Sequence, residues 1–440
     1  MRSGDRPNLL LPCSLSGAVM AFEGIRGATA LVNGPSGCKF YVAALVDAQD
    51  LREDPLDLGR HLSPLYFGQP RVACTCLQQE EIIYGSEGRL RTALEQLRAQ
   101  RPNDLIGIVN SCALSITGED LQGICREHGR VALVETSGFT GDLAAGFGQA
   151  GRVLVREVML PCAERRPNAI NLIGPMIGQY NWRNDRQELK RMLGRLGIAV
   201  NAVLTAGATL EEIAQAPRAS LNVVVGEEYG EEIVREMAAR FGLPAVGMEG
   251  YSPYGIRNTT GWLRQIAEAL GMDATGPLRE EIEGITSRVY PYLARYLSGG
   301  TLKGLPVAIF ADGSMVLALA DFLAEYLGLD PVLLGWKTVG RGTEGLLQRF
   351  SQERRLEPRV LRRPDLEEIA QGLRETSPEL ILGSGFEQWA AREAGLAGVP
   401  FLRIASPIWD QLILSERPFL GYKGVLFWIE EILNALRERI

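Results

Sequence analysis

Short apolar segments alternate with amphipathic segments along almost the whole chain of 440 residues. The apolar segments are typical of buried β-strands, and most are followed within a few residues by Gly, Ser, Asp or Asn. Such strands are predicted at 28–32, 105–109, 131–134, 169–173, 199–204, 221–225, 307–310, 331–334, 380–382 and 399–404. Helical periodicity predicts helices at 87–100, 185–196, 231–241, 314–327 and 385–394. Buried strands alternating with helices indicate βαβ units, and therefore an α/β fold with parallel sheets.

The number of predicted strands is too large for one sheet, so the chain is expected to form several domains. A polar, proline-containing break at 165–168 follows the first group of strands. A helical segment at 278–297 ends in Ser298-Gly299-Gly300, just before the strand predicted at 307. We therefore predict three α/β domains, at 1–165, 166–300 and 301–415, and a C-terminal helix at 416–440.

Charge and hydropathy narrow the classes of partner. The net charge of −7 argues against nucleic acid and anionic membranes as main partners. No run of about 18 apolar residues occurs, so no transmembrane helix is predicted. The apolar stretch near the N-terminus is too short for a signal peptide. These features predict a cytoplasmic protein that binds neither nucleic acid nor a membrane.

The seven cysteines all lie within the first 162 residues. In a reducing compartment, clustered thiols are more often metal ligands or packing residues than disulfides. Cys13 follows a proline, Cys38 ends a glycine-containing turn, and Cys112 follows an apolar strand. Three thiols at the ends of core elements indicate a soft metal centre, with an iron–sulfur cluster as the first candidate. Spacing alone leaves this open, because a single buried cysteine usually packs as a small hydrophobic residue.

The other four cysteines are weaker candidates. Cys125 and Cys162 are assigned to packing. Cys74 and Cys76 would point to opposite faces of an extended segment, so at most one of them is expected near a cluster. The three thiols of Cys13, Cys38 and Cys112 therefore form the predicted ligand set.

The motifs around these cysteines occur in a characteristic order. They are Pro12-Cys13 with Gly17-Ala18, Asn33-Gly-Pro-Ser-Gly-Cys38, Tyr84-Gly-Ser-Glu-Gly88, Ser111-Cys112, Ile116-Thr-Gly-Glu119, Ser137-Gly-Phe-Thr-Gly141 with Gly146, Asp312-Gly313, Gly383-Ser-Gly385 and Glu416-Arg-Pro-Phe-Leu-Gly-Tyr422. In this order they resemble the nitrogenase component 1 superfamily over nearly the whole chain. That superfamily includes the molybdenum–iron protein subunits, their cofactor-assembly relatives, the dark-operative protochlorophyllide reductases, the nickel-sirohydrochlorin reductive cyclase and methylthio-alkane reductase.

The resemblance implies a fold, a cofactor and partners. The fold would be three Rossmann-like parallel-sheet domains. Cys13, Cys38 and Cys112 would hold an iron–sulfur cluster, either 4Fe-4S or a larger eight-iron one, at an interface with a homologous component 1 subunit. A separate ATP-dependent iron–sulfur reductase would supply the electrons. Backbone N–H groups near the predicted cofactor-binding residues Gly34, Gly37 and Gly85 are expected to donate to cluster sulfurs.

One expected pair of ligands is missing. In the superfamily, the catalytic nitrogenase subunit anchors its large cofactor through a late cysteine and a late histidine. This chain has no cysteine after Cys162, and its histidines are His61 and His128, so no such cofactor is predicted here. Three alternatives stay open: a β-type electron-relay subunit, a reductase of a small molecule such as a tetrapyrrole, and a non-catalytic scaffold for cofactor assembly. A redox enzyme is favoured over the scaffold.

No residue is predicted to be catalytic. The chain lacks a G-x-x-x-x-G-K-[ST] phosphate loop, so ATP hydrolysis by that route is not expected. Gly383-Ser-Gly385 is interpreted as a strand-to-helix turn rather than an anion site, and Asp312 as a turn former or N-cap. Weaker candidates for the substrate cavity are Glu249, Tyr251, Tyr254, Arg71 and His61.

Overall fold

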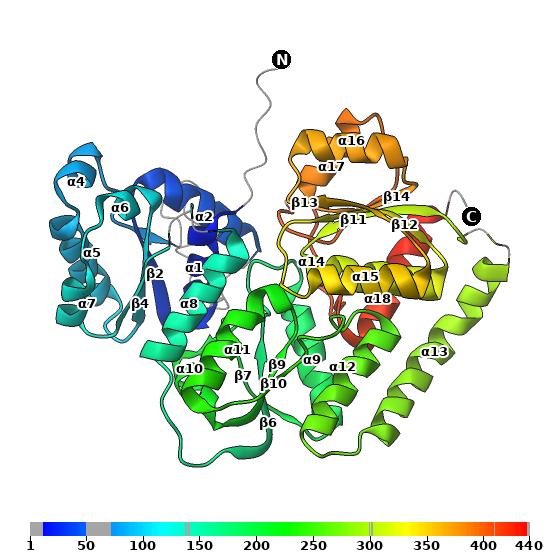
Figure 1. The fold of residues 1–440 in the computed structure, drawn as a ribbon, viewed down its shortest axis with the longest axis horizontal. Helices are drawn as coiled ribbons and strands as arrows, with labels where there is room; N and C mark the ends of the chain where they lie inside the picture. Colours follow the sequence, from blue (N-terminus) through cyan, green and yellow to red (C-terminus); the bar gives the residue numbers. More distant parts are fainter. Residues whose placement is uncertain are drawn as a thin grey trace.

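A computed structural model of the chain describes residues 12–49, 72–136, 139, 141–298, 300, 302–408 and 410–437. Figure 1 shows three lobes, each built on a sheet whose strands are all parallel. The predicted fold class, α/β with Rossmann-like parallel sheets, is confirmed. The weaker candidates Arg71 and His61 lie outside the described residues.

The first sheet has the strand order β3-β2-β4-β5. Its strands are β2 (Ala28–Asn33), β3 (Ala73–Cys74), β4 (Leu105–Asn110) and β5 (Val131–Val134). Its helices are α1 (Ser14–Glu23), α2 (Ser36–Gln49), α4 (Gln79–Tyr84), α5 (Glu87–Gln100), α6 (Cys112–Thr117), α7 (Gln122–His128) and α8 (Leu143–Glu157). Alternate residues of β2 face opposite sides, since Ala30 and Val32 join the main core while Leu31 packs with Leu90 and Leu94 of α5.

The second sheet has the order β10-β9-β6-β7. Its strands are β6 (Arg166–Ile173), β7 (Ala199–Val203), β9 (Ala219–Val224) and β10 (Ala245–Val246). The helical segments around it are α9 (Trp182–Arg195), α10 (Leu210–Ala214), the 3₁₀ turn η1 (Ala216–Arg218), α11 (Glu227–Phe241) and α12 (Gly255–Ala269). A short parallel pair, β1 (Ile25–Arg26) with β8 (Ala208–Thr209), ties this lobe to the first.

The third sheet has the order β13-β12-β11-β14-β15. Its strands are β11 (Pro306–Ala311), β12 (Asp330–Trp336), β13 (Arg359–Arg362), β14 (Leu380–Gly383) and β15 (Phe401–Arg403). Its helices are α14 (Gly313–Phe322), which continues as the π-helical turn η2 (Leu323–Leu327), α15 (Thr343–Arg354), α16 (Leu366–Thr376) and α17 (Gly385–Glu393). The long helix α13 (Thr275–Ser298) leads into this lobe, and α18 (Gly421–Leu436) packs on α12, α13 and α9.

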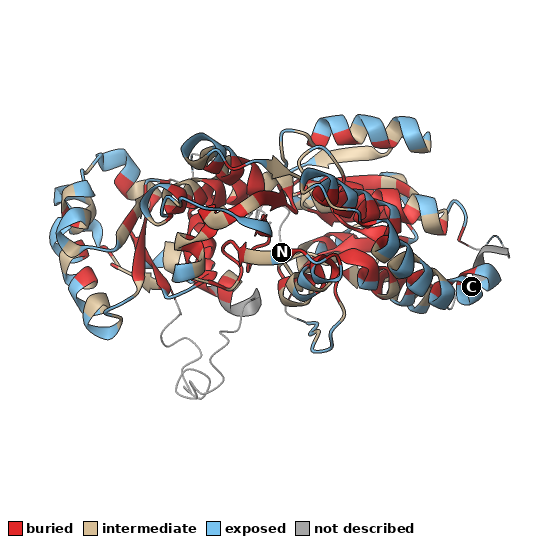
Figure 2. Cartoon of the chain, turned by 90° about the horizontal axis from the view of Figure 1, so that it is seen from below, coloured by how far each residue is buried: buried red, intermediate tan, exposed pale blue. Residues whose placement is uncertain are grey.

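The three lobes share one apolar core. A single cluster of buried side chains contains Val32 from the first sheet, Val223 from the second and Ile309 from the third. Figure 2 shows these buried residues as a red band through the centre, with exposed residues on the outer helices. No helix among the described residues has the length and apolar content needed to cross a membrane. The shared core fixes the first lobe, which carries Cys13, Cys38 and Cys112, against the other two.

Candidate functional site

The three predicted ligand cysteines stand at the starts of helices and border one cavity. Cys13 is the N-cap of α1, Cys38 lies in the first turn of α2, and Cys112 is the first residue of α6. All three line the same cavity. Their sequence separation is bridged because α2 and α6 follow the adjacent parallel strands β2 and β4. Helix N-termini carry partial positive charge, which favours thiolates.

A buried polar network holds the loops of Cys38 and Cys112 together. Asn33, at the end of β2, donates from Nδ2 to Oδ1 of Asn110, at the end of β4, over 3.2 Å. Thr75 Oγ1 donates to Asn33 Oδ1 over 3.1 Å and accepts from the Gly34 amide over 3.0 Å. Since Asn33 and Asn110 are almost completely buried, each lost bond would leave an unsatisfied polar group. The network fixes the geometry of the turns that carry the thiols.

Two further motifs meet in this network. Ser86, in the Tyr84-Gly-Ser-Glu-Gly88 motif, donates from its amide and hydroxyl to the Glu119 carboxylate over 2.9 and 2.6 Å. Glu119 follows α6, so this contact ties the start of α5 to the helix that begins with Cys112. The two sequence motifs therefore form one structural unit beside the thiols.

The thiols influence each other electrostatically. Burial, followed by the neighbouring charges of Cys112 and Cys13, raises the pKa of the Cys38 thiol. Among the described residues, no three His, Cys, Asp or Glu side chains converge closely enough to hold one metal ion. The trio is thus spread around the edge of the cavity. Such spacing suits a polynuclear centre with several metal atoms better than a single ion.

Of the remaining cysteines, Cys74 and Cys125 pack against apolar clusters. Burial raises the pKa of Cys74 to about 12 and that of Cys125 to about 11, so both thiols are protonated at neutral pH. The Cys74 thiol donates to the Gly34 carbonyl, and the Cys162 thiol donates to the Pro217 carbonyl over 3.1 Å. Cys76 has a positive φ of 52°. All seven cysteines lie in the described part of the chain, and none of them forms a disulfide.

The three predicted cofactor-binding glycines occupy different settings. The Gly34 amide already donates to Thr75, and a Cβ on Gly34 would stand 2.4 Å from the Ser111 hydroxyl. Gly34 therefore serves close packing of two turns. Gly85 has a φ of 121°, and its amide donates to the Glu81 carbonyl. Gly37 lies in the first turn of α2, where backbone N–H groups lack intrahelical acceptors. Of the three, Gly37 is the position best suited to donate to a cluster.

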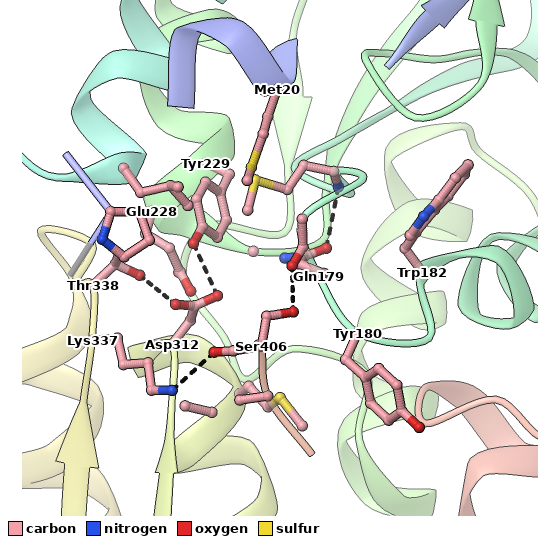
Figure 3. Close-up of a pocket in the computed structure, with 18 of the residues that line it drawn as sticks. Met20, Gln179, Tyr180, Trp182, Glu228, Tyr229, Asp312, Lys337, Thr338 and Ser406 are labelled. Carbon is pink, nitrogen blue, oxygen red and sulfur yellow. Dashed lines mark hydrogen bonds between the residues drawn. The ribbon is translucent and has the colours of Figure 1, made fainter. Parts of the chain in front are cut away.

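The cavity extends from the thiols into the space between the three lobes and has a volume of about 480 Å³. Most of its lining is apolar or aromatic: Leu15, Met20, Val42, Leu143, Met176, Tyr180, Trp182, Met315, Phe386, Ile404 and Phe419. Figure 3 shows Met20 of α1 above the cavity, with Tyr180 and Trp182 on one side and a polar group on the other. A largely apolar cavity with a few clustered polar groups is typical of a small-molecule site.

The polar group centres on two carboxyls. Asp312, between β11 and α14, accepts from the Tyr229 hydroxyl over 2.9 Å and from the Thr338 hydroxyl over 2.8 Å. Glu228, in the first turn of α11, accepts at Oε1 from the Ser314 hydroxyl over 2.7 Å. The two carboxyls lie side by side in Figure 3. Asp312 stands at the N-cap position of α14, as predicted, but its side chain makes no cap hydrogen bond and lines the cavity instead.

Lys337, whose ammonium group lies on the cavity wall, is already paired with a carboxylate. Lys337 Nζ lies 3.3 Å from Glu387 Oε2 and donates to the Ser406 carbonyl over 3.0 Å. The same Glu387 oxygen accepts from the Ser384 amide over 2.6 Å. The Glu387 carboxylate therefore occupies the helix start after Gly383-Ser-Gly385 and closes a capping box there, which agrees with a strand-to-helix turn.

The loop at residues 248–254, which carries the weaker candidates Glu249, Tyr251 and Tyr254, lines the cavity only in part. Tyr254 and Ser252 border it. Glu249 and Tyr251 are not among its described lining residues, and the Tyr251 ring lies under the Arg349 guanidinium at 5.2 Å. Glu228 and Lys337 were missed from the sequence. Each lies a few residues after the end of a predicted strand, and this position could have marked it as a candidate site residue.

Asp185, on the cavity wall, links the second lobe to the C-terminal segment. One of its carboxylate oxygens accepts from the amides of Phe419 and Leu420, over 2.6 and 3.0 Å. Burial raises the pKa of Asp185 to about 7, despite these two bonds. Ionisation of Asp185 is therefore unfavourable in the folded state.

We expect Asp185 to make the protein less stable as the pH rises. Because its folded pKa lies above its unfolded value, the loss begins near pH 4 and is complete just above pH 7, with a size on the order of 4 kcal/mol. Asp185→Asn keeps the accepting oxygen without the charge, so its thermal midpoint should stay flatter than that of the wild type between pH 5 and 8. Asp185→Ala should be destabilised at every pH in that range, since it leaves two buried amides unpaired. A wild type and Asp185→Asn with parallel pH profiles would contradict this account.

Comparisons with known proteins agree with this geometry. The family model described as "Nitrogenase component 1 type Oxidoreductase" matches residues 13–437. The nitrogenase molybdenum-iron protein beta chain of Methanococcus maripaludis is 23% identical, over 98% of this chain and 94% of that protein. A subunit of the light-independent protochlorophyllide reductase of Heliobacterium modesticaldum is 27% identical, over 84% of this chain and 70% of that protein.

An assembly protein and a solved structure complete the comparison. The nitrogenase iron-molybdenum cofactor biosynthesis protein NifE of Clostridium pasteurianum is 25% identical, over 96% of this chain and 86% of that protein. The structure "Nitrogenase Cp1 at pH 6.5" superimposes with a TM-score of 0.82 at 19% identity, covering 100% of this chain and 95% of the other, and so shares the fold. The match along nearly the whole chain shows that this protein belongs to the nitrogenase component 1 type oxidoreductase family.

Proposed function

We propose that this chain is a subunit of a nitrogenase-like, ATP-dependent reductase complex that reduces a small molecule bound in the cavity between the three lobes. Cys13, Cys38 and Cys112 would hold an iron–sulfur cluster at the edge of that cavity. The observation that carries the proposal is that all three thiols line the same cavity as the polar group of Glu228 and Asp312.

The donor set fits such a cluster. Three thiols at helix starts offer the soft, anionic ligands that iron–sulfur clusters require, and Gly37 lies one residue from Cys38. The neighbouring charges that raise the pKa of Cys38 would be offset by cationic iron. A bound cluster would supply single electrons to the cavity. The protein's own contribution is to orient the substrate and to exclude water with the apolar walls.

A homologous subunit would complete the site. Phe40 and Tyr41 follow Cys38 on α2, and Ile116 lies one turn after Cys112; their side chains are 52%, 61% and 77% exposed. Large exposed apolar side chains of this kind mark surfaces that a partner covers. Three thiols from each of two subunits would suit an interface cluster. A separate ATP-hydrolysing iron–sulfur reductase is the proposed electron donor, and the cytoplasm is the proposed location.

Direct binding of a substrate is favoured over a large anchored cofactor. The sequence carries no cysteine after Cys162 and no histidine after His128. The described lining of the second and third lobes consists of apolar, hydroxyl, carboxyl, amide and amine side chains. These groups suit an organic substrate better than iron. The relay role of a β-type subunit would use the same cluster without a substrate in this cavity.

The experiment that tests the proposal is anaerobic purification followed by electron transfer. Iron and sulfide should be present, and the cluster's visible absorption should bleach when the ATP-dependent reductase encoded by the same organism, a reductant and MgATP are added. The control replaces MgATP with MgADP and should show no bleaching. A cluster that accepts no electrons under ATP hydrolysis would favour the assembly scaffold, to which the similarity with NifE points.

A further inference from the structure

The Glu228 carboxyl in the cavity has one oxygen without a protein partner. Its Oε1 accepts from Ser314, while its buried Oε2 has no hydrogen-bond partner in the described structure. Asp312, beside it, has a donor on each oxygen, from Tyr229 and Thr338. Of the two carboxyls, only Glu228 therefore has an oxygen left for a ligand.

The two carboxyls differ in which form their surroundings favour. Donors stabilise an ionised carboxylate, so the two hydroxyls favour ionised Asp312. Burial and then the adjacent Asp312 charge raise the pKa of Glu228 to about 8, so Glu228 is protonated at neutral pH. Burial also raises the pKa of Asp312, while Thr338, Tyr229 and Lys337 oppose the increase.

The other titratable groups around Glu228 and Asp312 do not change which of the two carboxyls is protonated more readily. Tyr229 of α11 and Tyr254, before α12, stay neutral because burial raises the pKa of both well above the usual value. Lys337 and Asp142 act on Asp312 with opposite signs. Protonated Glu228 thus carries an O–H group on the cavity wall, where a bound molecule can supply the acceptor.

We propose that the cavity binds an uncharged, largely apolar organic molecule through one hydrogen-bond acceptor, to which the Glu228 carboxylic acid donates. A carboxylate ligand would be disfavoured, because the Asp312 carboxyl lies nearby and the Lys337 charge is already matched by Glu387. The apolar walls supply the rest of the affinity. A molecule of this kind is the substrate class of the proposed reductase, so the inference rests on the proposed function.

Three probes with the same ring separate the alternatives by charge. Cyclohexanone offers an uncharged acceptor, cyclohexanecarboxylate an anion, and cyclohexylammonium a cation. Binding to the full-length, iron-loaded protein is measured by low-affinity isothermal titration calorimetry at pH 6.5 and 9.5. At pH 6.5 the ketone should bind about tenfold more tightly than the carboxylate. Its affinity should fall about tenfold at pH 9.5, where Glu228 loses its proton.

Two variants assign the pH dependence to one side chain. Glu228→Gln keeps an N–H donor that does not titrate, so ketone binding should become nearly equal at the two pH values. Glu249→Gln is the matched control, since Glu249 is exposed and lies outside the described lining of the cavity; it should keep the wild-type profile. Melting curves verify that both variants are folded.

Four outcomes would overturn the inference: no ketone binding, equal or tighter binding of the carboxylate, tightest binding of the ammonium, or an unchanged pH profile in Glu228→Gln. The comparison of probes on the wild type stands even if the variant misfolds. Because binding is measured without electron transfer, a failure here leaves the bleaching experiment unaffected. A failure of ATP-dependent bleaching likewise leaves the binding result intact.

Discussion

Replacing Cys38 with alanine should remove most of the iron from the anaerobically purified protein and abolish its ATP-dependent bleaching. Burial first, and then the charges of Cys112 and Cys13, raise the pKa of Cys38, so this thiol lies within electrostatic reach of the other two. The loss of one ligand among three should weaken cluster binding by at least about tenfold, since even a lost supporting contact costs that much. Iron and sulfide quantitation, together with EPR of the reduced protein, gives the measurement.

The matched control for this prediction is Cys125→Ala. Cys125 packs in the small apolar cluster between α7 and the first sheet, and burial raises its pKa to about 11. Its loss should cost about 1 kcal/mol of stability and leave iron content unchanged. Cys13→Ala and Cys112→Ala should follow Cys38→Ala. If Cys38→Ala retains full iron and signal, or if Cys125→Ala loses as much iron, the ligand assignment is wrong.

The alternation of strands and helices was predictable because buried parallel strands are apolar on both faces. The helix predicted at 87–100 is α5 with the same bounds, and the strands predicted at 28–32 and 105–109 are β2 and β4, each longer by one residue. Helix α1 was not predicted, since all ten of its residues are buried and it has no polar face. Helix α8 was not predicted either, because its three glycines disfavour a helix in isolation.

The site was predictable only where a motif carries chemistry. The three thiols were singled out by motif order, and the structure places all three on one cavity. Glu228 was not singled out, because a glutamate in the first turn of a helix is ordinarily a solvated residue that complements the helix dipole. Its role depends on Asp312, 84 residues later, and on Ser314, which donates to it. Such long-range pairing has no local signal in a single sequence.

Substituting alanine for Gly146 should destabilise the protein strongly and disturb the cysteine site. Helices α1 and α8 pack with their backbones in direct contact, and the two motif glycines, Gly17 and Gly146, make this approach possible. A Cβ on Gly146 would stand 1.7 Å from the Ser14 carbonyl oxygen, and a Cβ on Gly17 would stand 1.9 Å from that of Leu143. Both obstacles are backbone atoms, so neither clash can be relieved by rotating a side chain.

The expected cost of Gly146→Ala is about 3 kcal/mol, seen as a lower thermal midpoint and a lower yield of folded protein. Since Ser14 directly follows Cys13, moving α1 away from α8 also moves Cys13, and iron content should fall in whatever protein remains folded. Gly284→Ala is the control: Gly284 lies within α13, a Cβ there would meet nothing within 4 Å, and the substitution should stabilise by about 0.5–1 kcal/mol. Wild-type stability and iron content in Gly146→Ala would show that α1 can shift without cost. In that case the conformation of α1 would not determine the position of Cys13.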